Sequence, residues 1–129
     1  MSVEAAQRRT TFRVPVPDPH WISATIVGED GSAAGAVLLD LSRMGMAARL
    51  NGDFELQRGL KLRCRLAFDD TTVDTEVTVR HCRHDERATR VGMEFTSLSD
   101  LHDSIISRAV FRLQRYLLRR QHGRAGLFN

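Results

Sequence analysis

Three arginines close to the N-terminus place three guanidinium groups on one short segment. Arg8, Arg9 and Arg13 fall within six positions, around the start of the proline-containing stretch "RVPVP". A guanidinium group is always charged and can donate two parallel hydrogen bonds to an anion such as a phosphate. Ahead of Arg13 there is little apolar content beyond Val3 and Phe12, so we expect residues 1–14 to form a flexible arginine arm. Such an arm either captures an anion or is an ordinary solvated run of charge.

A second polar motif, "DLSRMG", occupies residues 40–45. On an extended segment Asp40 and Ser42 point to the same side, and Gly45 allows a turn or a close backbone approach that a side chain would block. Because Asp, Ser and Gly are also ordinary turn residues, this motif alone is a weak signal. It becomes stronger beside Arg9 and Arg13, which have the spacing R-x-x-x-R.

The remaining reactive residues predict neither a metal site nor a catalytic centre. In "HCRH", His81 and Cys82 would point to opposite faces of a strand, whereas a zinc site needs three or four convergent ligands. Cys82 is out of phase with the inward Val79, and Cys64 is in phase with its own core face, so we expect no disulfide between the cysteines. No catalytic triad spacing, glycine-rich phosphate loop or carboxylate pair stands out, which argues against an enzyme.

Alternation of apolar and polar residues predicts the elements that carry these side chains. In "LKLRCRLAF" the apolar residues recur at every second position, which is the period of a strand with one solvated side. "VDTEVTVR" and "RVGMEF" repeat this alternation, and "WISATIV", "GAVLLDLS" and "GMAARL" are rich in strand-forming residues. Asp69 and Asp70 are expected to close a hairpin. We therefore predict an all-β body over residues 15–96, a closed six-stranded antiparallel barrel followed by one helix.

A change of period after the last strand predicts one amphipathic α-helix over residues 97–122, with a tail at 123–129. Apolar residues recur there at steps of three and four. Ser97 is expected to cap the start of the helix, and Gly123 is expected to stop it. The apolar face is expected to lie across the barrel, and the alternative is that part of it meets a partner. The whole chain then forms a single domain.

Charge and hydropathy limit the classes of function. The chain has 129 residues, of which 42% are hydrophobic, and a net charge of +3. Residues 1–14 carry three arginines against one glutamate, and residues 100–129 carry six arginines against two aspartates, so the middle of the chain is acidic. This distribution disfavours an extended track for a nucleic acid polymer. No apolar run approaches the ~20 residues that cross a bilayer, and the start lacks a secretory signal, so we expect a cytoplasmic protein without direct membrane insertion.

The two motifs in this order resemble the signature of the PilZ domain family. Arg9 and Arg13 precede the strands, "DLSRMG" enters the third strand segment, and "RVGMEF" and "LQRYLLRR" follow in the last strand and the helix. The resemblance extends from about Gln7 to Gln121. It implies a receptor for the bacterial second messenger cyclic di-GMP, with no other cofactor and no metal. In that family the arginine arm folds over ligand docked on the barrel, often a stacked pair of molecules.

The resemblance also assigns roles to single residues. By position, the implied contacts with cyclic di-GMP are Arg8, Arg9, Arg13, Asp40, Ser42 and Gly45. Arg90 is a candidate for a secondary contact, and the alternative is that it belongs to a solvated hairpin edge. Asp40 would accept hydrogen bonds from guanine N1–H and from the exocyclic amine. Met44 stands where many family members have a second glycine. The implied output is a relay to a protein effector that controls motility, biofilm or exopolysaccharide.

Two other functions are compatible with part of the sequence. A PilZ-like scaffold would work through protein contact without nucleotide, although the intact motifs speak against it. A barrel that binds single-stranded RNA would need stacking aromatic side chains on a basic face, and the chain has only eight Phe, Trp and Tyr residues. The helix end and "RVPVP" also resemble the PilZ half of flagellar-brake proteins, which carry another domain ahead of it. Both a single-domain adaptor and an excised domain stay open.

Overall fold

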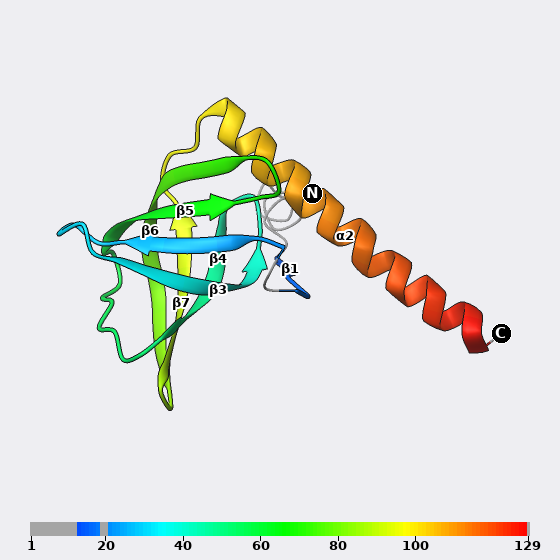
Figure 1. Ribbon diagram of the computed structural model, residues 1–129, viewed down its shortest axis with the longest axis horizontal. Coiled ribbons are helices and arrows are strands. Elements are labelled where there is room, and N and C mark those ends of the chain that lie inside the picture. Colours follow the sequence, from blue (N-terminus) through cyan, green and yellow to red (C-terminus); the bar gives the residue numbers. More distant parts are fainter. Residues whose placement is uncertain (1–12, 19–20, 129) are drawn as a thin grey trace, which may run out of the picture.

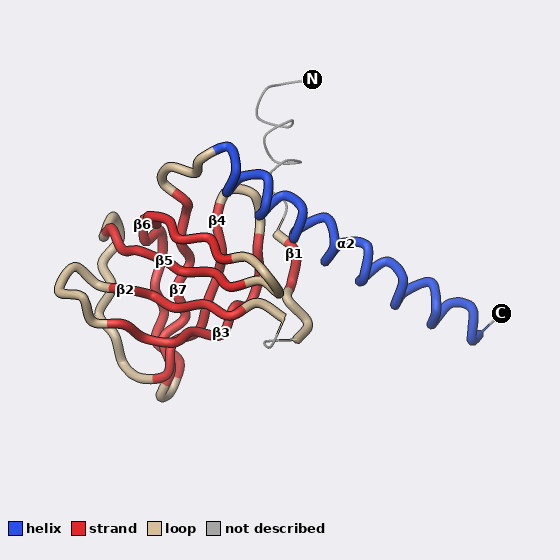
Figure 2. The backbone as a smooth tube through the Cα atoms, turned by 45° about the horizontal axis from the view of Figure 1, so that its top comes forward, coloured by secondary structure: helices blue, strands red, loops and turns tan. Residues whose placement is uncertain are grey.

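Within the described part of the chain, seven strands build the body, and six of them close into a barrel (Figure 1 and Figure 2). The computed structural model describes residues 13–18 and 21–128, with side chains as far as residue 120. Around the barrel the strands follow the order β3 (Ala33–Leu41), β2 (Ser23–Val27), β5 (Lys61–Ala67), β6 (Thr72–Asp85), β7 (Ala88–Phe95) and β4 (Gly45–Asn51), which returns to β3. All neighbours are antiparallel, and the short β1 (Val14–Pro15) adds to the end of β3. The predicted six-stranded barrel with one helix is confirmed.

The barrel interior is filled by the alternate apolar residues that the period-two pattern predicts. In β5, Leu62, Cys64 and Leu66 are buried, whereas the lysine and the arginines between them are exposed. Other strands contribute in the same way, and the core includes Leu38, Leu41, Met46, Leu50, Val73, Val77, Val79, Val91 and Met93. Removal of this apolar surface from water is the main force that closes the barrel. Burial, with a smaller contribution from Asp74, raises the pKa of the Cys64 thiol to about 12, so this thiol stays protonated.

Two bulges interrupt the alternation of inward and outward side chains. The register shifts between Leu38 and Asp40 in β3, and again between Val79 and His81 in β6. An extra residue in one strand reverses the phase of the side chains that follow it. Cys82 therefore lies opposite a buried valine of β7, on the inner side, and the predicted outward phase of Cys82 is wrong. Its thiol is free, as is that of the buried cysteine in β5.

Helix α2 (Asp100–Phe128) lies against one end of the barrel, as its apolar period predicts. Ile106, Val110 and Leu113 are buried in the same core as the strands. Figure 1 shows the first half of the helix beside the barrel and the second half extending away from it. Where the two part, Tyr116 packs edge-on against Trp21 of the segment before β2, with ring centroids 4.6 Å apart.

Both ends of α2 differ from the sequence prediction. The hydroxyl of Ser99 accepts a hydrogen bond from the backbone N–H of His102 at 3.1 Å, so Ser99 caps the helix in place of Ser97. The carbonyl of Ser97 instead accepts a hydrogen bond from the Thr75 hydroxyl, 3.4 Å away in β6. At the other end the helix continues past Gly123 and Gly126, and each glycine costs a helix only about 1 kcal/mol.

Candidate ligand-binding site

The polar motif at the end of β3 meets the arginine arm at Arg13. Arg13 directly precedes β1, and β1 pairs with β3 at Asp40. Nη1 of Arg13 lies 3.4 Å from Oδ1 of Asp40, and the two side chains are 43% and 24% exposed. The same carboxylate oxygen accepts a hydrogen bond from the backbone N–H of Ala47 at 3.2 Å. The structure thus brings together two of the predicted contacts, while Arg8 and Arg9 lie outside the described residues.

Ser42 holds the turn between β3 and β4 together. Its hydroxyl oxygen accepts hydrogen bonds from the backbone N–H groups of Met44 and Gly45, at 3.1 and 3.0 Å, and its proton is directed at the Gly45 carbonyl, 3.2 Å away. The backbone N–H of Ser42 donates to the same carbonyl at 2.9 Å. With 2% of its surface exposed, this serine has its hydrogen-bonding capacity used inside the turn.

Gly45 is required by a close approach between two strands. A Cβ at this position would overlap the backbone carbonyl oxygen of Met93 in β7, which cannot rotate away as a side chain could. The sequence predicts a close backbone approach at Gly45, and the structure identifies the neighbouring strand as the group that approaches. Gly45 and Ser42 therefore fix the backbone on which the Asp40 carboxylate is presented.

Arg43 connects this turn to the helix. Its Nη2 lies 3.5 Å from Oδ2 of Asp103 in the first turn of α2, and both side chains are nearly half exposed. Met44 beside it is 48% exposed, while its carbonyl accepts a hydrogen bond from the backbone N–H of Phe95 at 2.8 Å. The sequence offers no signal for the contact between Arg43 and Asp103, because the two partners are sixty residues apart.

Small residues separate Asp40 from an imidazole on the outer face of the barrel. The register places Asp40 opposite Ala47 of β4, Ala47 opposite Gly92 of β7, and Gly92 opposite His81 of β6. Residues directly opposite one another project from the same face of a sheet. The ring of His81 covers Gly92 so closely that a Cβ there would overlap it. Only Ala47 and Gly92 lie between the Asp40 carboxylate and the His81 imidazole in this row, so no large side chain projects between the two polar groups.

The neighbouring row of outward-facing residues on β4, β7 and β6 consists of three arginines. Arg49 of β4 lies opposite Arg90 of β7, and Arg90 lies opposite Arg83 of β6. All three are exposed, and none forms an ion pair with another residue that the structure describes. Because like charges directly opposite one another are destabilising, the row favours a bound anion. The sequence singles out Arg90, whereas Arg49 becomes its neighbour only through the strand register.

Other polar side chains of the barrel are paired in simple ways. Arg80 binds Glu94 at 2.7 Å, and Nδ1 of His84 lies 2.8 Å from Oδ1 of Asp53. Among the described residues no group of three His, Cys, Asp or Glu side chains is close enough to hold a metal ion. No helix in residues 21–128 is both long and apolar enough to cross a membrane.

A closed six-stranded barrel, a segment whose Arg13 meets an aspartate on the outer face, and one terminal helix define a class of small barrel domains. The chain belongs to the PilZ domain family, whose model matches residues 7–112. It is 30% identical, over 129 residues, to the flagellar brake protein YcgR of Thauera aminoaromatica, a match that covers 91% of this chain and 49% of the relative. The chain thus spans about half the length of that relative.

Solved structures show the same fold. YcgR of Escherichia coli in complex with c-di-GMP superposes with a TM-score of 0.73 at 23% identity, over 90% of this chain and 50% of that one. The PilZ domain of the same protein with c-di-GMP gives 0.70 at 22% identity, over 90% of this chain and 98% of that one. The K. pneumonia MrkH complex with c-di-GMP gives 0.76 at 15% identity, over 88% and 56%.

Proposed function

We propose that the chain is a receptor domain that binds cyclic di-GMP on the outer face of the barrel. The Arg13–Asp40 pair carries the proposal, because it places a guanidinium and a carboxylate together on an accessible surface. The guanidinium can bind a phosphate or guanine O6 and N7, and the carboxylate can accept from guanine N1–H and the exocyclic amine. Membership of the PilZ family and the ligand named for the E. coli and K. pneumonia structures support the choice of cyclic di-GMP.

The contact between Arg13 and Asp40 is one that a ligand can replace at little cost. At 3.4 Å between exposed side chains, the pair contributes at most about 1 kcal/mol. Each partner then turns to the ligand, Arg13 to phosphate or to the guanine edge and Asp40 to the guanine donors. Arg8 and Arg9 supply the remaining guanidinium groups of the arm.

Ser42 and Gly45 take part in the site by holding its backbone. The Ser42 hydroxyl is fully engaged within the turn, so a direct bond to ligand would require one of the internal bonds to open. Gly45 keeps β4 against β7 and leaves no side chain beside the turn. The arginine row of Arg49, Arg83 and Arg90 then provides charge for a second phosphate, or for the second molecule of a stacked pair.

The signal that such a receptor relays would pass to a protein effector in the cytoplasm, without catalysis by this domain. Because the chain spans about half of its YcgR relative, control of motility, biofilm or exopolysaccharide is proposed for the system in which the domain acts. The alternative is a PilZ-like scaffold that binds no nucleotide. The arginine row favours the receptor, since an interaction scaffold has no need for three opposed positive charges.

Calorimetric titration with cyclic di-GMP tests this function. Arg9→Ala and Arg13→Ala should each weaken binding roughly ten- to a hundredfold, because each removes a charge-assisted hydrogen bond worth about 1.5–3 kcal/mol. Arg→Lys at either position should also weaken binding, since lysine lacks the planar guanidinium that donates two parallel hydrogen bonds. Arg119→Ala, on the exposed helix, is the matched control and should bind normally. Absence of heat from the wild type at high micromolar nucleotide would support the scaffold instead.

A further inference from the structure

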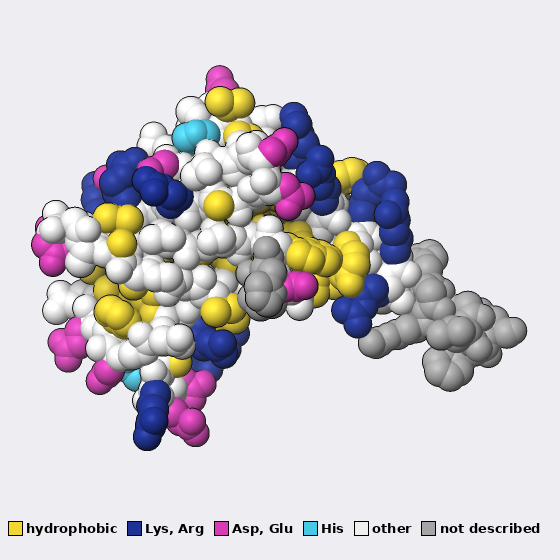
Figure 3. Space-filling view, in the orientation of Figure 1, with side chains coloured by type: hydrophobic (Ala, Val, Ile, Leu, Met, Phe, Trp, Pro, Cys, Tyr) yellow, Lys and Arg dark blue, Asp and Glu magenta, His cyan; other side chains and the backbone are white. Residues whose placement is uncertain are grey.

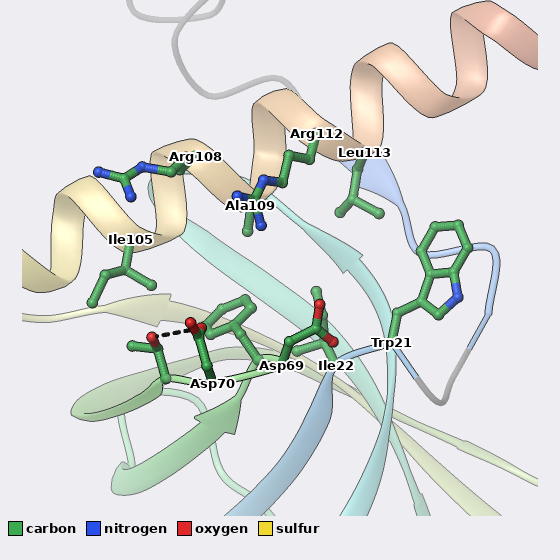
Figure 4. Close-up of a pocket in the computed structure, with 11 residues that line it drawn as sticks. Trp21, Ile22, Asp69, Asp70, Ile105, Arg108, Ala109, Arg112 and Leu113 are labelled. Carbon is green, nitrogen blue, oxygen red and sulfur yellow. Dashed lines mark hydrogen bonds between the residues drawn. The ribbon is translucent and has the colours of Figure 1, made fainter.

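A groove on another part of the molecule lies between helix α2, the turn that joins β5 to β6, and the segment before β2 (Figure 4). It encloses about 440 Å³. Its apolar lining comes from all three elements and includes Ile22, Phe68, Ile105 and Leu113. At one end stands Trp21, 38% exposed and held edge-on by Tyr116. The groove therefore offers a fixed apolar surface to something that can enter it.

Opposite charges line the two walls of this groove. Arg108 and Arg112 belong to the helix, and Asp69 and Asp70 belong to the β5–β6 turn (Figure 4). Asp70 accepts a hydrogen bond from the neighbouring Thr71 hydroxyl at 3.0 Å. None of the four charges has an ion-pair partner among the residues that the structure describes. Figure 3 shows the same division, with dark blue side chains along α2 and magenta ones on the adjacent barrel surface.

The opposite charges of the two walls restrict what can occupy the groove. An occupant with charge of one sign would satisfy one wall and be repelled by the other. A second copy of the chain related by a two-fold axis supplies both signs, because each surface of one copy then meets the complementary surface of the other. Both sets of charges are satisfied at once by this arrangement, and Trp21 is the kind of rigid aromatic side chain that such interfaces use.

We propose that the chain associates with a second copy of itself through this groove. The grooves of the two copies face one another about the two-fold axis, so that the β5–β6 turn of one copy lies against α2 of the other, and Asp69 and Asp70 of one copy meet Arg108 and Arg112 of the other. Both aspartates of the turn are exposed beside the groove, so a facing copy can reach them. The contact is small and rich in charge, so the association is weak, reversible and sensitive to salt.

Sedimentation velocity of the full chain tests the association itself. The mean mass should rise from 14.6 kDa toward twice that value as the protein is concentrated from about 10 μM to about 1 mM. Raising the ionic strength from about 0.05 to about 0.5 M should shift the monomer–dimer equilibrium at least about fivefold toward the monomer. A chain that stays monomeric throughout this range would overturn the proposal.

Charge reversal tests the pairing. Arg112→Glu and Asp69→Arg should each weaken self-association at least about tenfold, because each places like charges against one another. An equimolar mixture of the two variants should recover it. In the mixed dimer the introduced glutamate of one copy faces the introduced arginine of the other, and the second contact keeps the original Arg112 and Asp69.

A control variant makes the same charge change outside the groove. Arg115 lies over the Phe111 ring on α2, and Arg115→Glu should associate like the wild type. Circular dichroism confirms that each variant is folded. Failure of the mixture to recover, or association unchanged in both single variants, would show that this groove is not the interface.

Discussion

At the proposed site we expect Asp40 to be the side chain that distinguishes guanine from adenine. Adenine lacks O6 and presents an amine where an arginine seeks an acceptor, and it has no N1–H for the carboxylate. We expect cyclic di-AMP to bind far more weakly than cyclic di-GMP in calorimetric titrations. Asp40→Asn should reduce that preference, while its remaining oxygen can still accept from the Ala47 N–H and preserve the fold. Equal affinity of the wild type for both nucleotides would mean that only phosphates are read.

Gly45 is the residue whose replacement should cost the most stability in the motif. A Cβ there would overlap the Met93 carbonyl, so Gly45→Ala must displace β4 or β7, which costs about 1–3 kcal/mol in the free energy of unfolding. Urea denaturation measures the loss. Gly35→Ala in β3 is the control, because a Cβ at Gly35 meets no atom within 4 Å. If both variants lose the same stability, the close approach between the strands is not what requires glycine.

Single residues were predictable from the sequence only where spacing carried the signal. The sequence places Arg13 and Asp40 in one site, and the structure brings their side chains to within 3.4 Å. The internal bonds of Ser42 depend on the shape of the turn, and nothing in the sequence distinguishes them from bonds to a ligand. Arg49 depends on which strand lies beside β4, so its alignment with Arg90 appears only once the barrel closes.

At the scale of elements, the period of two predicted β5, β6 and β7, and strand-forming residues predicted β2, β3 and β4. The bulges limited the precision of the period. Leu39 and Arg80 lie at the register shifts, and neither differs in type from an ordinary strand residue. Each extra residue reverses the phase of the side chains that follow it, so Asp40 faces outward beside β4 and Cys82 faces inward. The predicted start of the helix was wrong for a similar reason. Ser97 and Ser99 have the same capping chemistry, and the path of the loop determines which of them caps the helix.

Two serine substitutions test which residue caps the helix. Ser99→Ala removes the acceptor of the His102 N–H and should lower the free energy of unfolding by about 1 kcal/mol. Ser97→Ala should change it by less than about 0.5 kcal/mol, because the Ser97 side chain is exposed and the hydrogen bond from Thr75 goes to the backbone carbonyl, which alanine keeps. Thermal unfolding of the two variants compares them under identical conditions. A larger loss from Ser97→Ala than from Ser99→Ala would contradict the assignment of the cap.

At the scale of the whole molecule, helix α2 adjoins both proposed surfaces. Its first turn holds Arg43 of the ligand-site turn through Asp103, and its next turns provide Arg108 and Arg112 to the groove. In the barrel every strand pairs with a neighbour on each side, so the closed sheet has no free edge strand. Ligand is therefore expected to act on the arm and the β3–β4 turn, and to leave the paired strands unchanged.

The arm is where ligand binding should have its largest effect on the whole molecule. Residues 1–12 contain little apolar surface beyond Val3 and Phe12, and their clustered arginines repel one another, so the sequence predicts fast amide exchange there without ligand. If the proposed function holds, part of the binding free energy is expected to go into ordering the arm, and the ordered arm with its ligand would form the new surface that an effector recognises. Hydrogen exchange with and without cyclic di-GMP measures this change. Residues 8–12 should pass from fast to slow exchange, while β5 and Val14, already paired with Leu41, should change little. If residues 8–12 are protected without ligand, or remain unprotected at saturation, the arm does not become ordered over the ligand, even where calorimetry detects binding.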